Sequence, residues 1–192
     1  MKNKIIVFLI FLTSVKYSCY SQTKPSIGET KSWISRKLKD NVKDEVVTLQ
    51  SVDMSMTDSY RDFYFIQDTL VIYYVIRHTK GGTSSFYYSQ TRHLYIPLKQ
   101  ISKCAIKTLK TVQEGESNEK KYECLKFICK SDVIFCIAEG NIPGYENGRI
   151  NMGDSFEFPF DFSKENNIYE RLRTAFKVVL KYYNVTEQAE AY

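Results

Sequence analysis

The sequence predicts an α+β fold: a mainly antiparallel sheet, or a partly open barrel, of about seven to eight strands, with a short N-terminal helix and a long C-terminal amphipathic helix packed on it. The 192 residues include 15 Tyr and 12 Phe, rings that suit pleated strands, but only 8 Gly and 4 Pro. The apolar periodicity is helical before Glu45, alternates in twos after it, and becomes helical again beyond Ser163. With 43% hydrophobic residues, the composition excludes a disordered tail, a collagen-like repeat and a multi-span membrane protein.

The N-terminal helix is marked by a capping box. Ser26 and Glu29 stand at the spacing at which each side chain accepts a hydrogen bond from the other's backbone N–H. Trp33, Ile34 and Leu38 then repeat on one helical face, so a short helix is expected from about 27 to 41. Trp33, the only tryptophan, is interpreted as a packing anchor on that face.

Alternating segments predict eight strands. They are expected near 45–52, 60–67, 69–77, 84–97, 101–111, 121–130, 132–140 and 154–162. The segment 70–76 is almost continuously apolar and should be central or covered on both faces. Short connections between consecutive strands indicate an antiparallel meander. Since no linker divides the chain, residues 22–192 are expected to form a single domain.

The last strand and the C-terminal helix should pack on each other. Pro159 cannot donate to a ladder, so this strand should lie at an edge or carry a bulge. Asp161 or Ser163 is expected to cap a helix over about 164–184, which has a full apolar stripe. That stripe would cover the phenyl face of the strand, formed by Phe156, Phe158, Phe160 and Phe162.

A strand meander closed by one C-terminal helix, over residues 45–184, resembles the layout of the pleckstrin-homology-like barrels. The resemblance rests on the order of the elements and on no residue motif. It implies a barrel that binds phosphoinositide headgroups or peptides. The same order of elements is also compatible with two other folds, an open sheet packed on two helices and a lipocalin-like cup.

Residues 1–21 have the pattern of a secretory signal peptide. A basic start, an apolar run over 5–12 and the small-x-small site Cys19-Tyr20-Ser21 follow one another, so Gln22 would begin the mature chain. The apolar run is shorter than the roughly 20 residues that cross a bilayer. The segment resembles the leaders of many exported proteins of Gram-negative bacteria. A secreted or periplasmic location is therefore expected, with no transmembrane segment after cleavage.

A lipoprotein acylated at Cys19 is the alternative. The residues before it, Lys16-Tyr17-Ser18, lack the small and aliphatic side chains that such a site normally has. Cleavage also removes three lysines, which leaves 24 basic residues against 22 acidic ones. Nucleic acid is not an expected partner, because a nearly balanced chain lacks a concentrated basic face.

Four cysteines remain after cleavage: Cys104, Cys124, Cys129 and Cys136. In an oxidising compartment they are candidates for disulfides. If residues 131–132 form a hairpin turn, Cys129 and Cys136 lie on one face as diagonal neighbours, and a bridge from Cys104 to Cys124 is equally compatible with the sequence. Buried free thiols are the alternative. No Cys-x-x-Cys is present, so neither zinc nor another metal is expected.

The chain contains none of the common motifs that place a nucleophile, a metal or a nucleotide, so neither an enzyme nor a cofactor is expected. His78 and His93 are its only histidines, and both stand in predicted strands. Two-carboxylate chemistry through Glu157 and Asp161, with Asp154 nearby, is the catalytic alternative.

Three groups of residues are candidate binding sites. Tyr145 and Arg149 stand in the segment 140–153, which is expected to be a long loop. Arg173 and Lys177 recur on one face of the C-terminal helix, where they would meet an acidic partner or anionic lipid. The third group is aromatic and consists of Phe86, Tyr87, Tyr88 and Tyr95 around a strand pair, since some of the strand tyrosines must reach solvent or a partner.

These features favour a non-enzymatic exported domain that binds a protein partner or an amphiphilic ligand in the cell envelope. A periplasmic immunity or inhibitor protein is one form of this hypothesis. A hydrolase that acts on envelope polymers through carboxylates is the alternative. An envelope lipid or glycan is the expected partner if a protein is not. The identity of the ligand and the oligomeric state do not follow from the sequence.

Overall fold

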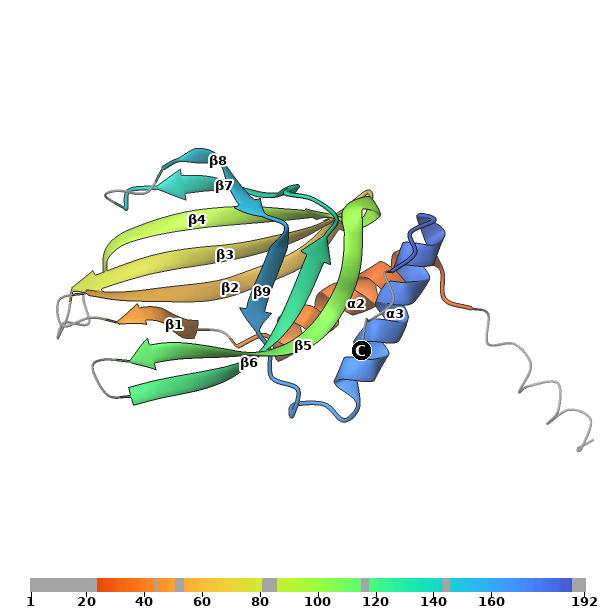
Figure 1. The fold of residues 1–192 in the computed structure, drawn as a ribbon, viewed down its shortest axis with the longest axis horizontal. Coiled ribbons are helices and arrows are strands. Elements are labelled where there is room, and N and C mark those ends of the chain that lie inside the picture. Colours follow the sequence, from red (N-terminus) through yellow and green to blue (C-terminus); the bar gives the residue numbers. More distant parts are fainter. Residues whose placement is uncertain are drawn as a thin grey trace, which may run out of the picture.

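The computed structural model describes residues 24–43, 45–50, 54–80, 86–114, 118–142 and 146–187. The expected signal peptide, with Cys19, and the candidate residue Tyr145 lie outside these residues. The described residues form two α-helices, a 3-10 turn and nine strands (Figure 1). In chain order these are α2 (Ile27–Asn41), β1 (Glu45–Gln50), β2 (Met54–Ile66), β3 (Thr69–Lys80), β4 (Phe86–Pro97), η1 (Leu98–Gln100), β5 (Ile101–Glu114), β6 (Asn118–Cys129), β7 (Ile134–Gly140), β8 (Gly148–Gly153), β9 (Ser155–Pro159) and α3 (Ile168–Tyr182).

The predicted α+β class is confirmed, with one strand more than the sequence suggested. The strands form an open, mainly antiparallel sheet in the order β8-β7-β4-β3-β2-β1-β5-β6-β9. The apolar strand β3 is internal, as expected, and β9 with Pro159 is an edge strand. The extra strand is β8, which lies in the segment expected to be a loop and pairs with β7.

The predicted meander is only partly correct. Strands β1 to β4 pair in succession, but β5 then pairs in parallel with β1, through Gln50 and Glu114. After the β5–β6 hairpin the chain returns to the other edge, where β7 pairs with β4. The expected hairpin between Cys129 and Cys136 is therefore wrong, because β6 and β7 belong to opposite halves of the sheet.

The sheet has two different ends (Figure 1). At one end, which we call the hairpin end, four pairs of consecutive strands meet: β1 and β2, β3 and β4, β5 and β6, and β7 and β8. The opposite, crossover end holds the β2–β3 turn and the connections β4–β5, β6–β7 and β8–β9, which join strands that are not neighbours. Backbone bonds join these connections: the Leu98 N–H donates to Asp68 O (2.8 Å), the Lys130 N–H to Gln100 O (2.8 Å) and the Cys129 N–H to Asp154 O (2.7 Å). They hold the edges of the curled sheet together at this end.

Helix α2 begins as the sequence predicts. The Glu29 backbone N–H donates to Ser26 Oγ (3.2 Å), and the Ser26 N–H donates to Glu29 Oε2 (2.6 Å). Both helices cover the inner side of the sheet, because their buried residues share one core with those of the strands. In the described part of the chain, no helix is long and apolar enough to cross a membrane.

The phenyl side chains of the last strand belong to this core, as expected. Phe158 is fully buried, and its ring centre lies 6.2 Å from that of Phe127, which meets Phe176 of α3 edge-on at 5.3 Å. Phe162 likewise meets Tyr169 of α3 edge-on at 5.7 Å. Aromatic contacts thus join the sheet to the C-terminal helix.

The start of α3 differs from the prediction. The helix begins at Ile168 after Asn167, whose backbone has the left-handed φ of 56°. Asp161 caps a local turn instead: its Oδ1 accepts hydrogen bonds from the backbone N–H and the hydroxyl of Ser163 (3.0 and 2.6 Å). These bonds lower the pKa of Asp161.

Cys104, Cys124, Cys129 and Cys136 are all buried free thiols, so neither of the disulfides considered from the sequence forms. Burial is the main cause that raises the pKa of Cys124 and of Cys129 to about 11, which keeps both thiols neutral at physiological pH. The register of β5 on β6 explains the absent bridge between Cys104 and Cys124, because Cys124 faces Thr108 across this ladder.

Candidate functional site

The outer side of strands β2, β3, β4, β7 and β8 carries an unusual row of rings. The ladder registers place Tyr73, His93, Ile137 and Arg149 side by side on one row across four strands. Val71, Tyr95 and Phe135 form the next row, and Tyr64 of β2 extends it. We call this surface the tyrosine–arginine face and define it as Tyr64, Tyr73, His93, Tyr95, Phe135, Ile137 and Arg149.

The side chains of this face are ordered by mutual stacking. The Arg149 guanidinium carbon lies 3.9 Å from the Phe135 ring centre, and the Phe135 ring lies 4.8 Å from that of Tyr95 at an interplanar angle of 10°. Beside this stack, the rings of Tyr73 and His93 are 4.8 Å apart, at 21°. His93 Nδ1 also lies 3.2 Å from the hydroxyl of Tyr64.

The alternation of the strands explains why these rings point outward. Their neighbours in sequence, Ile72, Leu94 and Cys136, face the other way and are fully buried. The two helices pack with those inward residues, so no helix of the described residues covers the outer side. The seven residues of the face are all partly exposed or exposed, with Ile137 at 38%.

The face combines apolar rings with polar edges. The ring faces stack on one another. The polar groups of this surface are the hydroxyls of Tyr73 and Tyr95 and the guanidinium of Arg149, which are surrounded by apolar rings. Tyr, Phe and Arg are the residues enriched at protein interfaces and at their energetic hot spots. Because the rings are already ordered, binding here costs little side-chain entropy.

The structure separates the candidate residues. Arg149 lies on strand β8 and not in a loop, which corrects the sequence prediction, and it joins the tyrosine–arginine face together with the predicted Tyr95. Arg173 and Lys177 lie on α3, which contacts α2 and β5, so they are not brought together with Arg149. The Arg173 guanidinium carbon lies 5.7 Å from the Tyr169 ring centre on its own helix, whereas the Lys177 side chain is exposed.

The carboxylates considered for catalysis have structural partners. Glu157 Oε2 accepts a hydrogen bond from the Thr108 hydroxyl (3.2 Å) in the neighbouring hairpin, and Asp161 binds Ser163. Asp154 contributes its backbone carbonyl to the crossover end.

A buried polar cluster that the sequence did not predict lies on the inner side of the sheet. Its centre is Gln90, whose Oε1 accepts a hydrogen bond from Arg92 Nε (2.9 Å) and whose Nε2 donates to Glu146 O (3.0 Å) and Asn147 Oδ1 (3.2 Å). Arg92 is almost fully buried. Gln90 thus ties the chain just before β8 to the inner side of β4.

Asp58 of β2 belongs to the same interior. Its Oδ1 is buried and has no hydrogen-bond partner among the described residues. Burial raises the pKa of Asp58 to about 6, although the charges of Lys110 and Arg92 oppose this shift. The predicted strand begins after Asp58, and a polar residue among alternating polar neighbours gives no sign of burial.

Within the described residues, no three His, Cys, Asp or Glu side chains gather so as to hold a metal ion. Comparison of the chain with protein-family models, curated protein sequences and solved structures finds no match.

Proposed function

We propose that the chain is a non-enzymatic exported domain that binds a protein partner through the tyrosine–arginine face. The observation that carries this proposal is the stack of Arg149, Phe135 and Tyr95, which is ordered and partly exposed on a sheet face that no described helix covers. Export is supported by the pattern of residues 1–21.

The shape of the face favours a protein over a small molecule. Its residues come from five neighbouring strands, which at about 4.8 Å between strands span roughly 20 Å. Such a broad, amphipathic surface suits a partner that covers several strands at once. An immunity or inhibitor protein that covers a toxin or a hydrolase would use a contact of this kind.

The hydrolase alternative has less support. Glu157 and Asp161 each have a local partner, and the two lie in different segments, one within β9 and one in the turn after it. Two-carboxylate hydrolysis needs two acids that face one scissile bond.

Affinity capture tests the proposal. The tagged mature domain, residues 22–192, is incubated with intact cell envelopes, and bound proteins and lipids are identified by mass spectrometry. We expect one stoichiometric protein that is lost with Tyr95→Ala and with Arg149→Ala. The control variants Lys177→Ala and Glu157→Gln should retain it. Loss with the control variants and retention with the face variants would contradict the proposal.

A further inference from the structure

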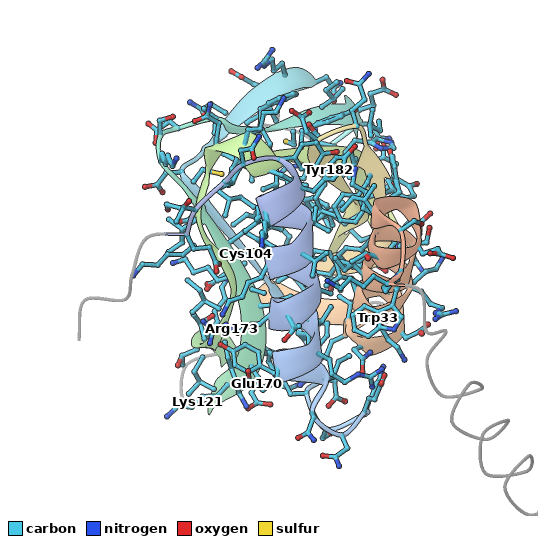
Figure 2. The ribbon with its side chains drawn as sticks, turned by 90° about the vertical axis from the view of Figure 1, so that its right-hand side faces the viewer. Trp33, Cys104, Lys121, Glu170, Arg173 and Tyr182 are labelled. Atoms are coloured by element: carbon cyan, nitrogen blue, oxygen red, sulfur yellow. The ribbon has the colours of Figure 1, made fainter. Side chains whose placement is uncertain are left out.

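A long groove runs along the outside of the two helices, away from the tyrosine–arginine face. It has a volume of about 1230 Å³ and is lined from both helices. Figure 2 looks onto these helices, with Trp33 labelled on α2 and Glu170 on α3. The lining consists of Lys24, Pro25, Gly28, Glu29, Thr30, Ser32, Trp33, Arg36, Glu170, Arg171, Thr174, Ala175 and Val178.

The helices are antiparallel and are tied together at two points. Lys31 Nζ donates to the hydroxyl of Tyr183 (2.6 Å) near one end, and Lys37 Nζ forms an ion pair with Glu165 Oε2 (2.5 Å) near the other. These two bonds join α2 to the residues that flank α3.

Part of the groove lining is apolar. Trp33, Ala175 and Val178 supply its apolar lining, and Val178 is 47% exposed. Gly28 has open space beside it, because a Cβ placed there would meet only Ser26 Oγ, at 3.9 Å. A hydrocarbon that covers this apolar strip would remove apolar surface from water, which lowers the free energy of the bound state.

Charged residues stand at the ends of this strip, and the balance is basic. The lining contains three basic residues and two acidic ones: Lys24, Arg36 and Arg171 against Glu29 and Glu170. The Glu29 carboxylate is bound to the backbone of Ser26, and Arg171 both pairs with Glu165 and lies 5.2 Å from the Trp33 ring centre. No ion pair of Lys24 or Arg36 is found within the described part of the chain.

We propose that this groove binds a single-chain amphiphile with an anionic head group. The hydrocarbon chain lies along Trp33, Ala175 and Val178, and the head group meets Arg36 at the end of the groove where Arg171 stacks on Trp33. A hydrocarbon suits walls made of helices, whose backbone groups are already bonded within each helix. An extended peptide would lose water from its own backbone there without gaining partners. The site is separate from the protein-binding surface proposed above.

The only tryptophan lines the groove and reports its occupancy. The emission of Trp33 is measured in the mature domain during titration with octanoate, decanoate and dodecanoate below their micelle concentrations. We expect saturable shifts, with an affinity that rises about fourfold for each added CH2 group. Dodecyltrimethylammonium, which has the same chain and the opposite charge, should bind at least tenfold more weakly.

Variants locate the binding. Arg36→Gln should weaken dodecanoate binding about fivefold to tenfold, and Val178→Glu should abolish it. Lys177→Gln, on the same helix but outside the lining, and Arg149→Ala, on the tyrosine–arginine face, should leave it unchanged. An emission that does not saturate, equal affinity for the two C12 compounds, or equal loss with Lys177→Gln would overturn the inference. Because Arg149→Ala removes only the proposed protein contact, failure of one proposal is distinguishable from failure of the other.

Discussion

The guanidinium carbon of Arg149 lies 3.9 Å from the ring centre of Phe135, although Ile137 is the residue directly opposite Arg149 in the β7–β8 ladder. The arginine therefore reaches diagonally along β7, as long side chains do across paired strands. Phe135 in turn stacks on Tyr95, its direct partner on β4. Three neighbouring strands thus contribute one ordered stack to the outer surface.

Residues of this face should matter little for folding. Arg149 is exposed and its contact is a cation–π stack, so Arg149→Ala should lower the free energy of unfolding by less than about 1 kcal/mol. Denaturant melts of the purified mature domain measure this. A loss above about 2 kcal/mol would mean that Arg149 is a structural residue, and capture data from the variant would then reflect unfolding.

Core rings should behave differently. Phe158 and Phe176 are buried and join the sheet to α3, so Phe158→Ala or Phe176→Ala should each cost on the order of 3 kcal/mol. The same denaturant melts give the comparison. A loss below about 1 kcal/mol for either variant would contradict the packing described for β9 and α3.

Asp58 should make stability depend on pH. Its pKa is about 6 in the folded chain and 3.8 as the ordinary value, so the folded state holds the proton more tightly. Stability is therefore full below about pH 4 and falls as the pH rises through 6, by on the order of 2–3 kcal/mol for this group. Asp58→Asn should remove that part of the pH dependence and stabilise the fold at pH 8. Urea melts at pH 5 and pH 8 test it, and an unchanged slope in the variant would exclude Asp58 as the cause.

Two glycines should respond in opposite directions to alanine. A Cβ at Gly140 would lie 2.3 Å from Ser89 O and 2.6 Å from Gln90 Cα, where β7 and β4 approach closely. Gly140→Ala should therefore cost about 1–3 kcal/mol. Gly28 lies in helix α2 with open space around it, so Gly28→Ala should stabilise by up to about 1 kcal/mol. Thermal melts compare the pair, and a neutral Gly140→Ala would disprove the close β4–β7 contact.

Local signals predicted the helices best. The Ser26 and Glu29 pair placed the start of α2, because a capping box depends only on residues three apart. The predicted start of α3 was wrong because an aspartate can cap either a helix or a turn. In the structure Asp161 caps the turn at Ser163.

Strand order and the functional face depend on long-range pairing, which periodicity does not contain. Tyr95 and Arg149 were each recognised as candidates, but their common surface requires β7 to lie between β4 and β8. Strand β8 was missed because its six residues contain only two inward apolar side chains, Ile150 and Met152, between Gly148 and Gly153. A strand so short is defined by its neighbour and not by its own pattern.

Site-specific photo-crosslinking tests the central claim, that the tyrosine–arginine face contacts a protein. A photoreactive phenylalanine is placed at Ile137, which is 38% exposed and lies between His93 and Arg149 on the face, or at Leu109, which is 62% exposed on β5. After irradiation in intact envelopes, we predict one crosslinked protein from position 137 and none of the same mass from position 109. The same product from both positions, or from position 109 alone, would contradict the claim.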